Sequence, residues 1–215
     1  MDPEDVLTPD AFQEQSGVSR ETRARLEAYL ALLRKWNRRI NLVSRASLED
    51  VWRRHVLDSS QLMAYLPPPP TGRPRVLLDL GSGAGLPGLV LAILGAGEVH
   101  LVEADSRKAA FLREAARVAE AEVEIHACRI EAVKPFPADV VTARALAPLP
   151  RLLALAAPFL APQGRGLFLK GAQAEAELAA ARRDWDFSME SHPSCTYGSG
   201  HILVIGVNGR ATTAY

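Results

Sequence analysis

One glycine-rich stretch, residues 76–88, has the residue types and spacing of a ligand-binding turn. It reads as a short apolar strand, a turn, and the start of a helix. Its glycines let the backbone turn sharply and approach a ligand closely. Gly83, Gly85 and Gly88 fit the dinucleotide pattern G-x-G-x-x-G, whereas Gly81, Gly83 and Gly85 fit the G-x-G-x-G loop of S-adenosylmethionine enzymes. The spacing alone leaves both ligands open.

Two carboxylates adjoin this turn, and the first of them helps to choose between the two ligands. Asp79 ends the strand before the turn, where it would repel a pyrophosphate and attract the cationic ammonium and sulfonium of S-adenosylmethionine. Glu103, at the end of the next predicted strand, can accept hydrogen bonds from the ribose that both ligands share. The second half shows no obvious acid/base pair for hydride transfer, and its last two histidines, His192 and His201, are expected to pack or face solvent. These observations favour S-adenosylmethionine.

Charged or polar residues follow almost every predicted strand. The carboxyl ends of parallel strands meet at one edge of the sheet, where the ligand crevice of such a fold lies. Several charges around one crevice favour a binding site over an ordinary solvated surface. In chain order these ends are Asp79, Glu103, residues 129–131, Arg144 and residues 170–171.

Composition indicates a globular protein without a strong overall charge. The 215 residues are 48% hydrophobic, and 25 basic side chains balance 25 acidic ones, so any nucleic-acid surface must be a local patch. Cys128 and Cys195 are too few for a disulfide framework or a cysteine-rich metal site, and we expect no metal.

The sequence contains no recognisable targeting or membrane segment. The first residues are acidic and lack the apolar stretch of a signal peptide. The most apolar tract, residues 145–162, contains Arg151 and four prolines, which is incompatible with a membrane-spanning helix. We therefore expect a cytoplasmic protein with no membrane partner.

A local positive patch lies between Arg34 and Arg54. Seven basic residues there face only Glu49 and Asp50. The patch is equally consistent with the solvated face of two amphipathic helices and with a phosphate-binding surface. The candidate RNA-binding residues are Arg34, Lys35, Arg38, Arg39, Arg54 and His55.

The elements that must position these residues fall into two parts. Residues 1–14 carry five acids and no base, and are expected to pack loosely. A helix is predicted from its N-cap at Ser19, and a second helix ends near Tyr65. Four prolines then stop the helix. We therefore predict a helical subdomain over residues 1–66 and a second domain over residues 67–215.

The second domain alternates strands with helices, the pattern of an α/β fold with a mostly parallel sheet. The last two of its seven predicted strands are expected to form an antiparallel pair at one edge. The predicted strands are 76–80, 98–103, 123–127, 139–142, 165–170, 185–191 and 201–207, and the predicted helices are 87–94, 106–120, 149–160 and 172–183.

Five motifs in order resemble those of the ribosomal RNA small subunit methyltransferase G family, also known as glucose-inhibited division protein B. The resemblance extends from about residue 30 to about residue 205, and it departs at Gly200, where relatives usually have arginine before the histidine. The motifs are residues 35–42 (KWNRRINL), 54–59 (RHVLDS), 79–88 (DLGSGAGLPG), 144–145 (RA) and 169–171 (LKG).

This resemblance implies a class I S-adenosylmethionine-dependent methyltransferase with a Rossmann-like fold and an N-terminal helical extension. It implies methylation of N7 of one guanosine in 16S ribosomal RNA, with the RNA or the small ribosomal subunit as partner and no obligate protein partner. Because N7 already has a lone pair, no general base is expected, and Arg144 and Lys170 are candidate positioning residues. The candidate donor-binding residues are Asp79, Gly81, Ser82, Gly83, Gly85, Leu86, Glu103, Ile130, Glu131 and Arg144.

Two other classes remain open from the sequence. An NAD-dependent oxidoreductase would use the G-x-G-x-x-G spacing, and it would bind NADH rather than S-adenosylmethionine. A non-catalytic RNA-binding module would rest on the patch between Arg34 and Arg54.

Overall fold

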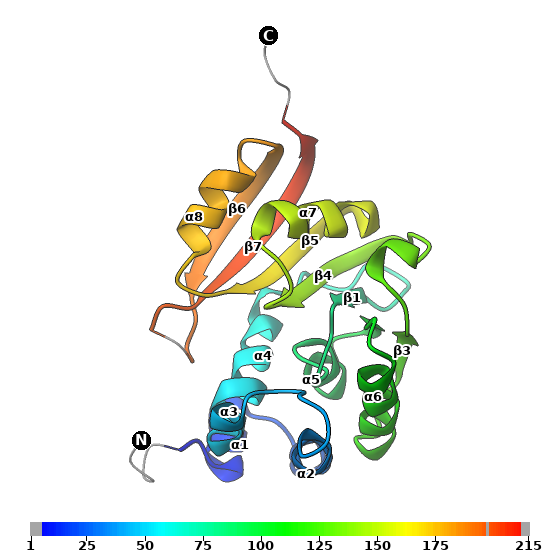
Figure 1. Ribbon diagram of the computed structural model, residues 1–215, viewed down its shortest axis with the longest axis vertical. Coiled ribbons are helices and arrows are strands. Elements are labelled where there is room, and N and C mark those ends of the chain that lie inside the picture. Colours follow the sequence, from blue (N-terminus) through cyan, green and yellow to red (C-terminus); the bar gives the residue numbers. More distant parts are fainter. Residues whose placement is uncertain (1–5, 197, 212–215) are drawn as a thin grey trace.

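The computed structural model describes residues 6–196 and 198–211, and it contains one seven-stranded sheet (Figure 1). The strand order is β3-β2-β1-β4-β5-β7-β6. β1 to β5 run parallel, and β7 is antiparallel to both β5 and β6. The predicted antiparallel pair at the edge is thus confirmed. The strands are β1 (Val76–Leu80), β2 (Glu98–Val102), β3 (Val123–His126), β4 (Ala138–Arg144), β5 (Leu160–Lys170), β6 (Trp185–Pro193) and β7 (His201–Arg210).

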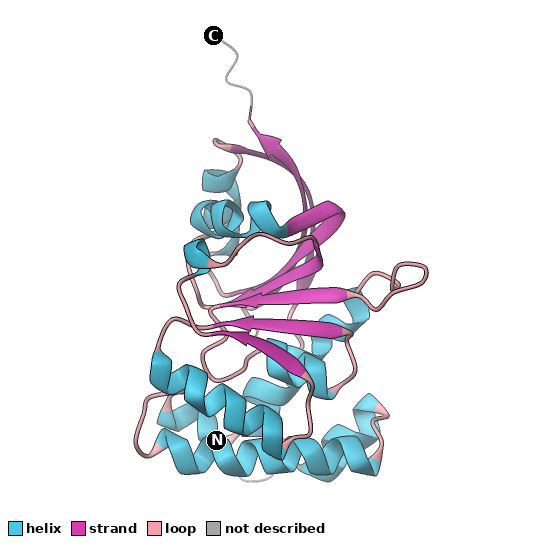
Figure 2. Cartoon of the chain, turned by 90° about the vertical axis from the view of Figure 1, so that its right-hand side faces the viewer, coloured by secondary structure: helices cyan, strands magenta, loops and turns pink. Residues whose placement is uncertain are grey.

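Helices cover both faces of the sheet (Figures 1 and 2). One layer contains α5 (Gly88–Ile93), α6 (Ser106–Val118) and the N-terminal helices, and the other contains α7 (Leu149–Ala156) and α8 (Ala174–Ala181). The N-terminal helices are α1 (Pro9–Ser16), α2 (Arg20–Asn37), α3 (Arg45–Glu49), a π-helical turn (Trp52–Leu57), α4 (Asp58–Ser60) and a 3₁₀ turn (Gln61–Tyr65). Two further 3₁₀ turns are Ile130–Ala132 and Ala157–Phe159.

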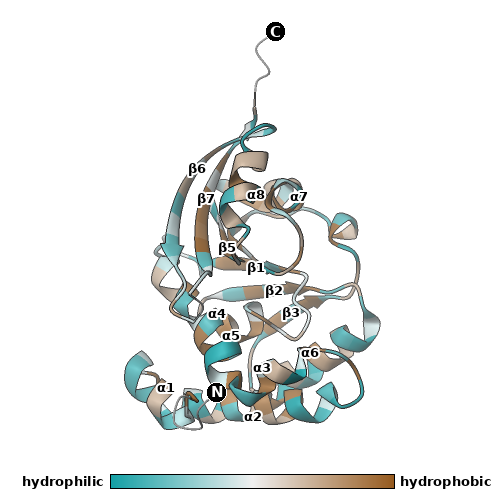
Figure 3. Ribbon diagram, turned by 60° about the vertical axis from the view of Figure 1, so that its left-hand side comes forward, coloured by the Kyte–Doolittle hydropathy of each residue, from teal (hydrophilic) through white to brown (hydrophobic). Residues whose placement is uncertain are grey.

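Alternation along the strands divides the apolar residues between two cores. On β1, Leu77 faces the N-terminal helices, whereas Leu78 and Leu80 face α7 and α8. In Figure 3 apolar residues run along β7, while the outermost strand β6 is largely polar. Since β6 is an edge strand with one exposed flank, this polarity limits edge-to-edge association.

The N-terminal helices share the first core with the sheet. α2 begins after Ser19, whose side chain accepts a hydrogen bond from the Thr22 amide, as predicted for its N-cap. Tyr29 is fully buried in this core, and its hydroxyl donates to the carbonyl of Ala84 at 2.7 Å. The N-terminal helices are therefore hydrogen-bonded directly to the glycine turn.

The prediction that residues 1–14 pack loosely is wrong for its described part, because α1 begins at Pro9. Thr8 caps this helix by accepting from the Ala11 amide, and Pro9 suits the first helical turn. Phe12 is fully buried, with its ring centroid 5.3 Å from that of Trp52. The prediction also covers residues 1–5, which lie outside the described residues.

The boundaries also differ around β5. The helix predicted over 149–160 ends at Ala156 and continues only as a 3₁₀ turn, since Pro158 cannot donate a helical hydrogen bond. β5 begins at Leu160 rather than Arg165, because pairing with β4 extends the strand through its glycines. Within residues 6–196 and 198–211, no helix has the length and apolar character needed to cross a membrane.

Candidate functional site

The glycine turn lies between β1 and α5, at the carboxyl ends of the parallel strands. Gly81, Gly83 and Gly85 all have positive φ angles, of 67°, 56° and 88°, which disfavour other residues. A Cβ on Gly81 would lie 2.6 Å from a methyl carbon of Leu146, and one on Gly85 would lie 2.8 Å from Leu89. A Cβ on Gly83 would meet only the carbonyl oxygen of Gly81, at 3.8 Å. Two of the glycines therefore serve packing, and only Gly83 borders open space.

Asp79 anchors this turn from behind. Its carboxylate is fully buried, accepting a hydrogen bond from the Thr142 hydroxyl at 2.7 Å and from the Gly88 amide at 3.2 Å. Burial raises the pKa of Asp79 to about 6, against the lowering effect of these hydrogen bonds. Because Asp79 has no exposed surface, it would influence a ligand through its charge and through the turn that it holds.

Glu103 connects the end of β2 to the same turn. Its carboxylate accepts from the Gly83 amide at 2.9 Å and from the Asp105 amide at 2.8 Å, and the residue is 8% exposed. A carboxylate has about four acceptor positions, so two remain for ligand hydroxyls. The structure thus places Glu103 directly beside the one glycine of this turn that borders open space.

The other predicted donor-site residues surround this turn unequally. Ser82 and Leu86 are buried, and Ser82 binds the turn to its neighbours through its hydroxyl and its amide. Ile130 is half-buried and Glu131 is exposed, both in the 3₁₀ turn after β3. These residues are near the strand ends, but Ser82 and Leu86 offer almost no side-chain surface.

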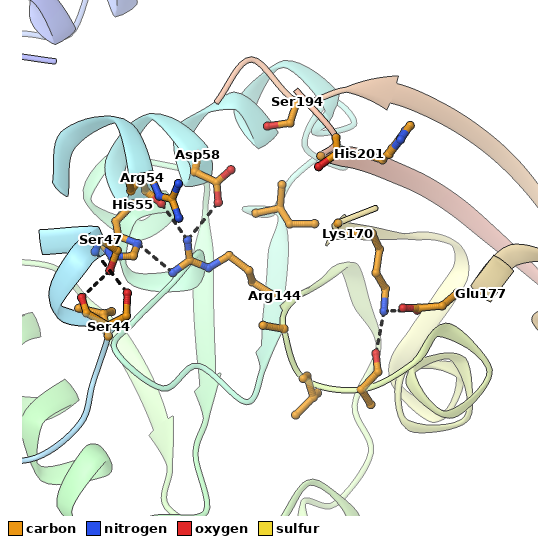
Figure 4. Close-up of a pocket in the computed structure, with 18 of the residues that line it drawn as sticks. Ser44, Ser47, Arg54, His55, Asp58, Arg144, Lys170, Glu177, Ser194 and His201 are labelled. Atoms are coloured by element: carbon orange, nitrogen blue, oxygen red, sulfur yellow. Dashed lines mark hydrogen bonds and ion pairs between the residues drawn. The ribbon is translucent and has the colours of Figure 1, made fainter. Parts of the chain in front are cut away.

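A cavity of about 770 Å³ opens beyond β4 and β5 (Figure 4). It is lined by parts of the N-terminal helices, the loop after β4 and the segment before β7. Ala145 has φ of 52°, and this sharp turn follows Arg144 and precedes Leu146, which both line the cavity. Since Leu146 also packs against Gly81, the cavity lies next to the glycine turn.

Arg144 is held at one side of the cavity by the N-terminal helices. Its guanidinium donates to Asp58 at 3.0 Å, to the Arg54 carbonyl at 3.2 Å and to Nδ1 of His55 at 3.2 Å (Figure 4). The Arg144 side chain is 19% exposed and that of Asp58 only 5%, so this ion pair is largely shielded from water. Helical spacing alone would pair Asp58 with Arg54, four residues earlier, whereas the tertiary structure supplies Arg144.

His55 is a neutral member of this network. A guanidinium can only donate, so Nδ1 of His55 must accept, and the proton must be on Nε2, which lies 3.0 Å from the Ser47 hydroxyl. Ser47 in turn donates to the carbonyl of Ser44 at 2.8 Å. Burial, with the nearby charges of Arg144 and Arg54, lowers the pKa of His55 to about 3. The His55 lone pair is therefore already engaged and cannot serve as a general base in this arrangement.

Lys170 lies on the opposite side of the cavity, at the end of β5. Its ammonium donates to the carbonyl of Ala147 and to the Glu177 carboxylate, both at 2.7 Å. Glu177 also accepts from the Leu149 amide at 2.7 Å, which joins α8 to the start of α7. One ammonium proton remains for a ligand, since Lys carries three donors.

Several of these partners have no clear signal in the sequence. Ser47 has no local signal, and Glu177 resembles an ordinary acidic residue in the first turn of a helix. Thr196 donates to Asp58 at 2.6 Å from 138 positions along the chain. His201, expected to pack or face solvent, lines the cavity. Only three-dimensional contact reveals these residues, because each comes from a different element.

The basic segment adjoins the cavity. Arg53 pairs with Asp50 at 3.1 Å, while Arg54 and His55 line the cavity itself. Residues 42–44 line this cavity and also a neighbouring hollow that Arg38, Arg39 and Arg45 surround. The exposed members of the predicted RNA-binding set are Arg34, Lys35, Arg38 and Arg39.

Comparison with known proteins identifies close relatives along the whole fold. Residues 22–203 match the family described as rRNA small subunit methyltransferase G. The chain is 58% identical over 205 residues to ribosomal RNA small subunit methyltransferase G of Rhodospirillum rubrum, covering 95% of this chain and 100% of the relative. It is 59% identical to the protein of that name in Rhodospirillum centenum, over 89% of this chain and 87% of the relative.

A solved structure with lower sequence identity shares the fold. The ribosomal protein L11 methylase of Lactobacillus delbrueckii subsp. bulgaricus superposes with a TM-score of 0.54 at 18% identity. The superposition covers 69% of this chain and 76% of the methylase. This similarity supports the α/β methyltransferase fold that the strand order shows.

Proposed function

The chain belongs to the rRNA small subunit methyltransferase G family, and from this premise we propose that it transfers a methyl group from S-adenosylmethionine to N7 of a guanosine in 16S ribosomal RNA. The observation that carries the proposal is the position of Leu146, which contacts both the glycine turn and the cavity. S-adenosylmethionine bound at the turn and a guanine base bound in the cavity would then lie next to each other. Membership of a methyltransferase family excludes the oxidoreductase and the non-catalytic binding module as primary functions.

The residues at the turn fit S-adenosylmethionine. Gly83 leaves the space that a close ligand requires, and Glu103 has free acceptor positions for the two ribose hydroxyls. The buried carboxylate of Asp79 disfavours a pyrophosphate and favours a cationic ligand. When bound, S-adenosylmethionine supplies an electrophilic methyl group on a sulfonium. We assign the adenine side to Ile130 and Glu131, by resemblance to the family.

The cavity suits a reaction that needs positioning rather than proton removal. Guanine N7 has an in-plane lone pair, so no base must first deprotonate it. His55 is neutral with its lone pair engaged, and Asp58 and Glu177 are each paired with a cation. Arg144 and Lys170 retain N–H donors that can bind O6 of guanine or a phosphate. Holding the reacting atoms about 3 to 3.5 Å apart and in line would then supply much of the catalysis.

We assign RNA binding to residues 1–66 and donor binding to residues 67–215. Arg34, Lys35, Arg38 and Arg39 all have exposed side chains, and Arg38 and Arg39 line the hollow next to the cavity, where phosphates would contact them. The macromolecular partner is then 16S ribosomal RNA, bare or within the small subunit, and no obligate protein partner is required. Since ribosomal RNA is the substrate, we place the reaction in the cytoplasm.

The proposal is tested by transfer of tritium from labelled S-adenosylmethionine to ribosomal RNA from a strain that lacks the protein. Bare 16S RNA and isolated small subunits are assayed in parallel, and the modified base is mapped. We expect label at N7 of a single guanosine, in at least one of the two substrates. Label on another atom, or on another class of RNA, would refute the assigned specificity. Absence of label from both substrates, with folded protein and bound donor, would refute the activity.

A further inference from the structure

A cluster of metal-ligating side chains lies on the sheet, apart from the site described above. The pairing of β2 with β3 places His100 opposite Glu124 and Val102 opposite His126. Side chains alternate along a strand, so His100, Glu124 and His126 share one face of the sheet. This is the face covered by α7 and α8, and the cluster is close to the edge formed by β3.

The spacing of the three side chains matches that of ligands around one ion. Nδ1 of His100 is 3.2 Å from Nε2 of His126 and 3.4 Å from a carboxylate oxygen of Glu124. The other carboxylate oxygen is 3.6 Å from Nε2 of His126. In a tetrahedral zinc site with bonds of about 2.0–2.1 Å, neighbouring ligand atoms lie about 3.3–3.4 Å apart. An ion can therefore reach all three residues with little movement.

A fourth residue, Glu98, orients His100, which is the most buried of the three metal-ligating side chains. Nε2 of His100 lies 3.1 Å from the carboxylate of Glu98, so this nitrogen carries the proton and donates to Glu98. The lone pair of Nδ1 then points toward Glu124 and His126. A carboxylate that accepts from the far nitrogen of a histidine is the usual outer partner of a metal ligand.

The cluster has more acceptors than donors. The Nδ1 lone pair of His100 and the two oxygens of Glu124 require donors, and a proton on Nε2 of His126 satisfies only one of them at a time. The His100 side chain is 8% exposed, and Phe136 packs 4.5 Å away between ring centroids, which limits access of water. Glu124 is 63% exposed and leaves a path for an ion from solvent.

We propose that His100, His126 and Glu124 bind a divalent transition-metal ion of the Zn²⁺ type, with Glu98 as the positioning residue and water as the remaining ligand. Two imidazoles and one carboxylate favour such an ion over Ca²⁺ or Mg²⁺, which prefer oxygen ligands. From the sequence we expected no metal, because two cysteines are too few for a cysteine-rich site. The four residues proposed here lie on two strands and carry no sequence motif. The ion would take no part in the chemistry of methyl transfer.

The ion would fasten the edge strand β3 to β2. The carbonyl of His126 also accepts from the Glu103 amide at 3.1 Å, so the ligand is one hydrogen bond from the residue assigned to the ribose. Metal binding should therefore stabilise this side of the donor crevice as well as the strand. Because an ion that binds only the folded state raises stability, the melting temperature should increase with Zn²⁺ concentration.

The test is a calorimetric titration of the chelator-treated full chain with Zn²⁺, together with measurement of bound metal after dialysis. We expect one Zn²⁺ per chain, and a tetrahedral absorption spectrum when Co²⁺ is used as the probe. His126→Gln should abolish stoichiometric binding, and Glu98→Gln should weaken it by about 10- to 100-fold. If His126→Gln does not fold, Glu124→Gln replaces it, since that side chain is exposed.

His192→Gln is the matched control. It removes another histidine paired with a glutamate, Glu190 at 3.3 Å, without touching the cluster, and should bind Zn²⁺ as the wild type does. Failure of the wild type to bind one Zn²⁺ would overturn the proposal. Equal binding by the wild type and His126→Gln, or by the wild type and Glu124→Gln where His126→Gln does not fold, would also overturn it. Loss of binding in Cys195→Ser alone would assign the metal to that exposed thiol and refute the histidine site.

Discussion

Replacing Gly83 by alanine places a methyl group in the open space at the glycine turn. The backbone there has φ of 56°, so alanine costs about 1–2 kcal/mol of folding free energy through left-handed strain. The nearest atom to the new carbon is the Gly81 carbonyl oxygen at 3.8 Å, so no steric clash adds to this cost. The strain is present with and without ligand and cancels in the dissociation constant. Any loss of donor affinity must then come from the methyl group itself.

Gly95 offers a matched control for this strain. It has φ of 79°, a Cβ there would meet no atom within 4 Å, and it precedes β2 at the opposite end of the sheet from the turn. Gly95→Ala should therefore lose comparable stability but keep its donor affinity. We expect Gly83→Ala to bind S-adenosylhomocysteine at least about tenfold more weakly, which corresponds to about 1.4 kcal/mol.

The assay is calorimetric titration of both variants with S-adenosylhomocysteine, alongside urea unfolding. Equal and wild-type affinities in the two variants would show that Gly83 does not face the donor, and would refute the assignment of the crevice. Equal losses in both would show that affinity follows global stability rather than the space at the turn. Unfolding free energies that fall far more in one variant than in the other would contradict the strain argument.

Four further predictions concern the carboxylate, the basic segment and the arginine network. Glu103→Ala should weaken S-adenosylhomocysteine binding by about 1.5–3 kcal/mol without changing RNA affinity; calorimetry that shows unchanged donor binding would contradict its assigned role. Replacing Arg38 and Arg39 together by alanine should make the slope of log RNA affinity against log salt shallower by up to about 1.4, and an unchanged slope would make them a solvated helix face. The pKa of His55 is lower in the folded state than in the unfolded state, so the stability that neutral His55 contributes is present above pH 6.5 and is lost as pH falls toward 3. This loss is at most about 1.4 kcal/mol per pH unit. Urea unfolding at several pH values should show the loss in the wild type and not in His55→Gln. Asp58→Asn should reduce the free energy of unfolding by up to about 3 kcal/mol, because it leaves a mostly buried guanidinium without its counter-charge; a change within about 0.5 kcal/mol would show that the pair is solvated.

Local sequence patterns predicted most of the secondary structure. Each of the seven strands occurs within a few residues of its predicted position, except that β5 starts earlier at Leu160. The N-cap at Ser19 and the connector of four prolines depend on neighbouring residues alone, and both are recovered. Phe12 was missed because its burial depends on Trp52, which is 40 positions away.

The sequence also identified Gly83, Glu103, Arg144 and Lys170 as candidates, because each follows a strand whose carboxyl end must face the crevice. It did not determine their partners. Arg144 binds Asp58 from the N-terminal helices, and Lys170 binds Glu177 from α8. Which charge meets which depends on how the helices pack against the sheet.

Residue type and short-range spacing therefore determined the glycine turn, the alternation of strands and helices, and the positions of the strand ends. All three features depend on backbone preference and periodicity over a few residues. Only the tertiary structure decided that Asp79 is buried, that Leu146 contacts both the turn and the cavity, and that His100, Glu124 and His126 meet on one face. These contacts join segments from 24 to 65 positions apart, and their energies depend on the burial and register that arise when the sheet assembles.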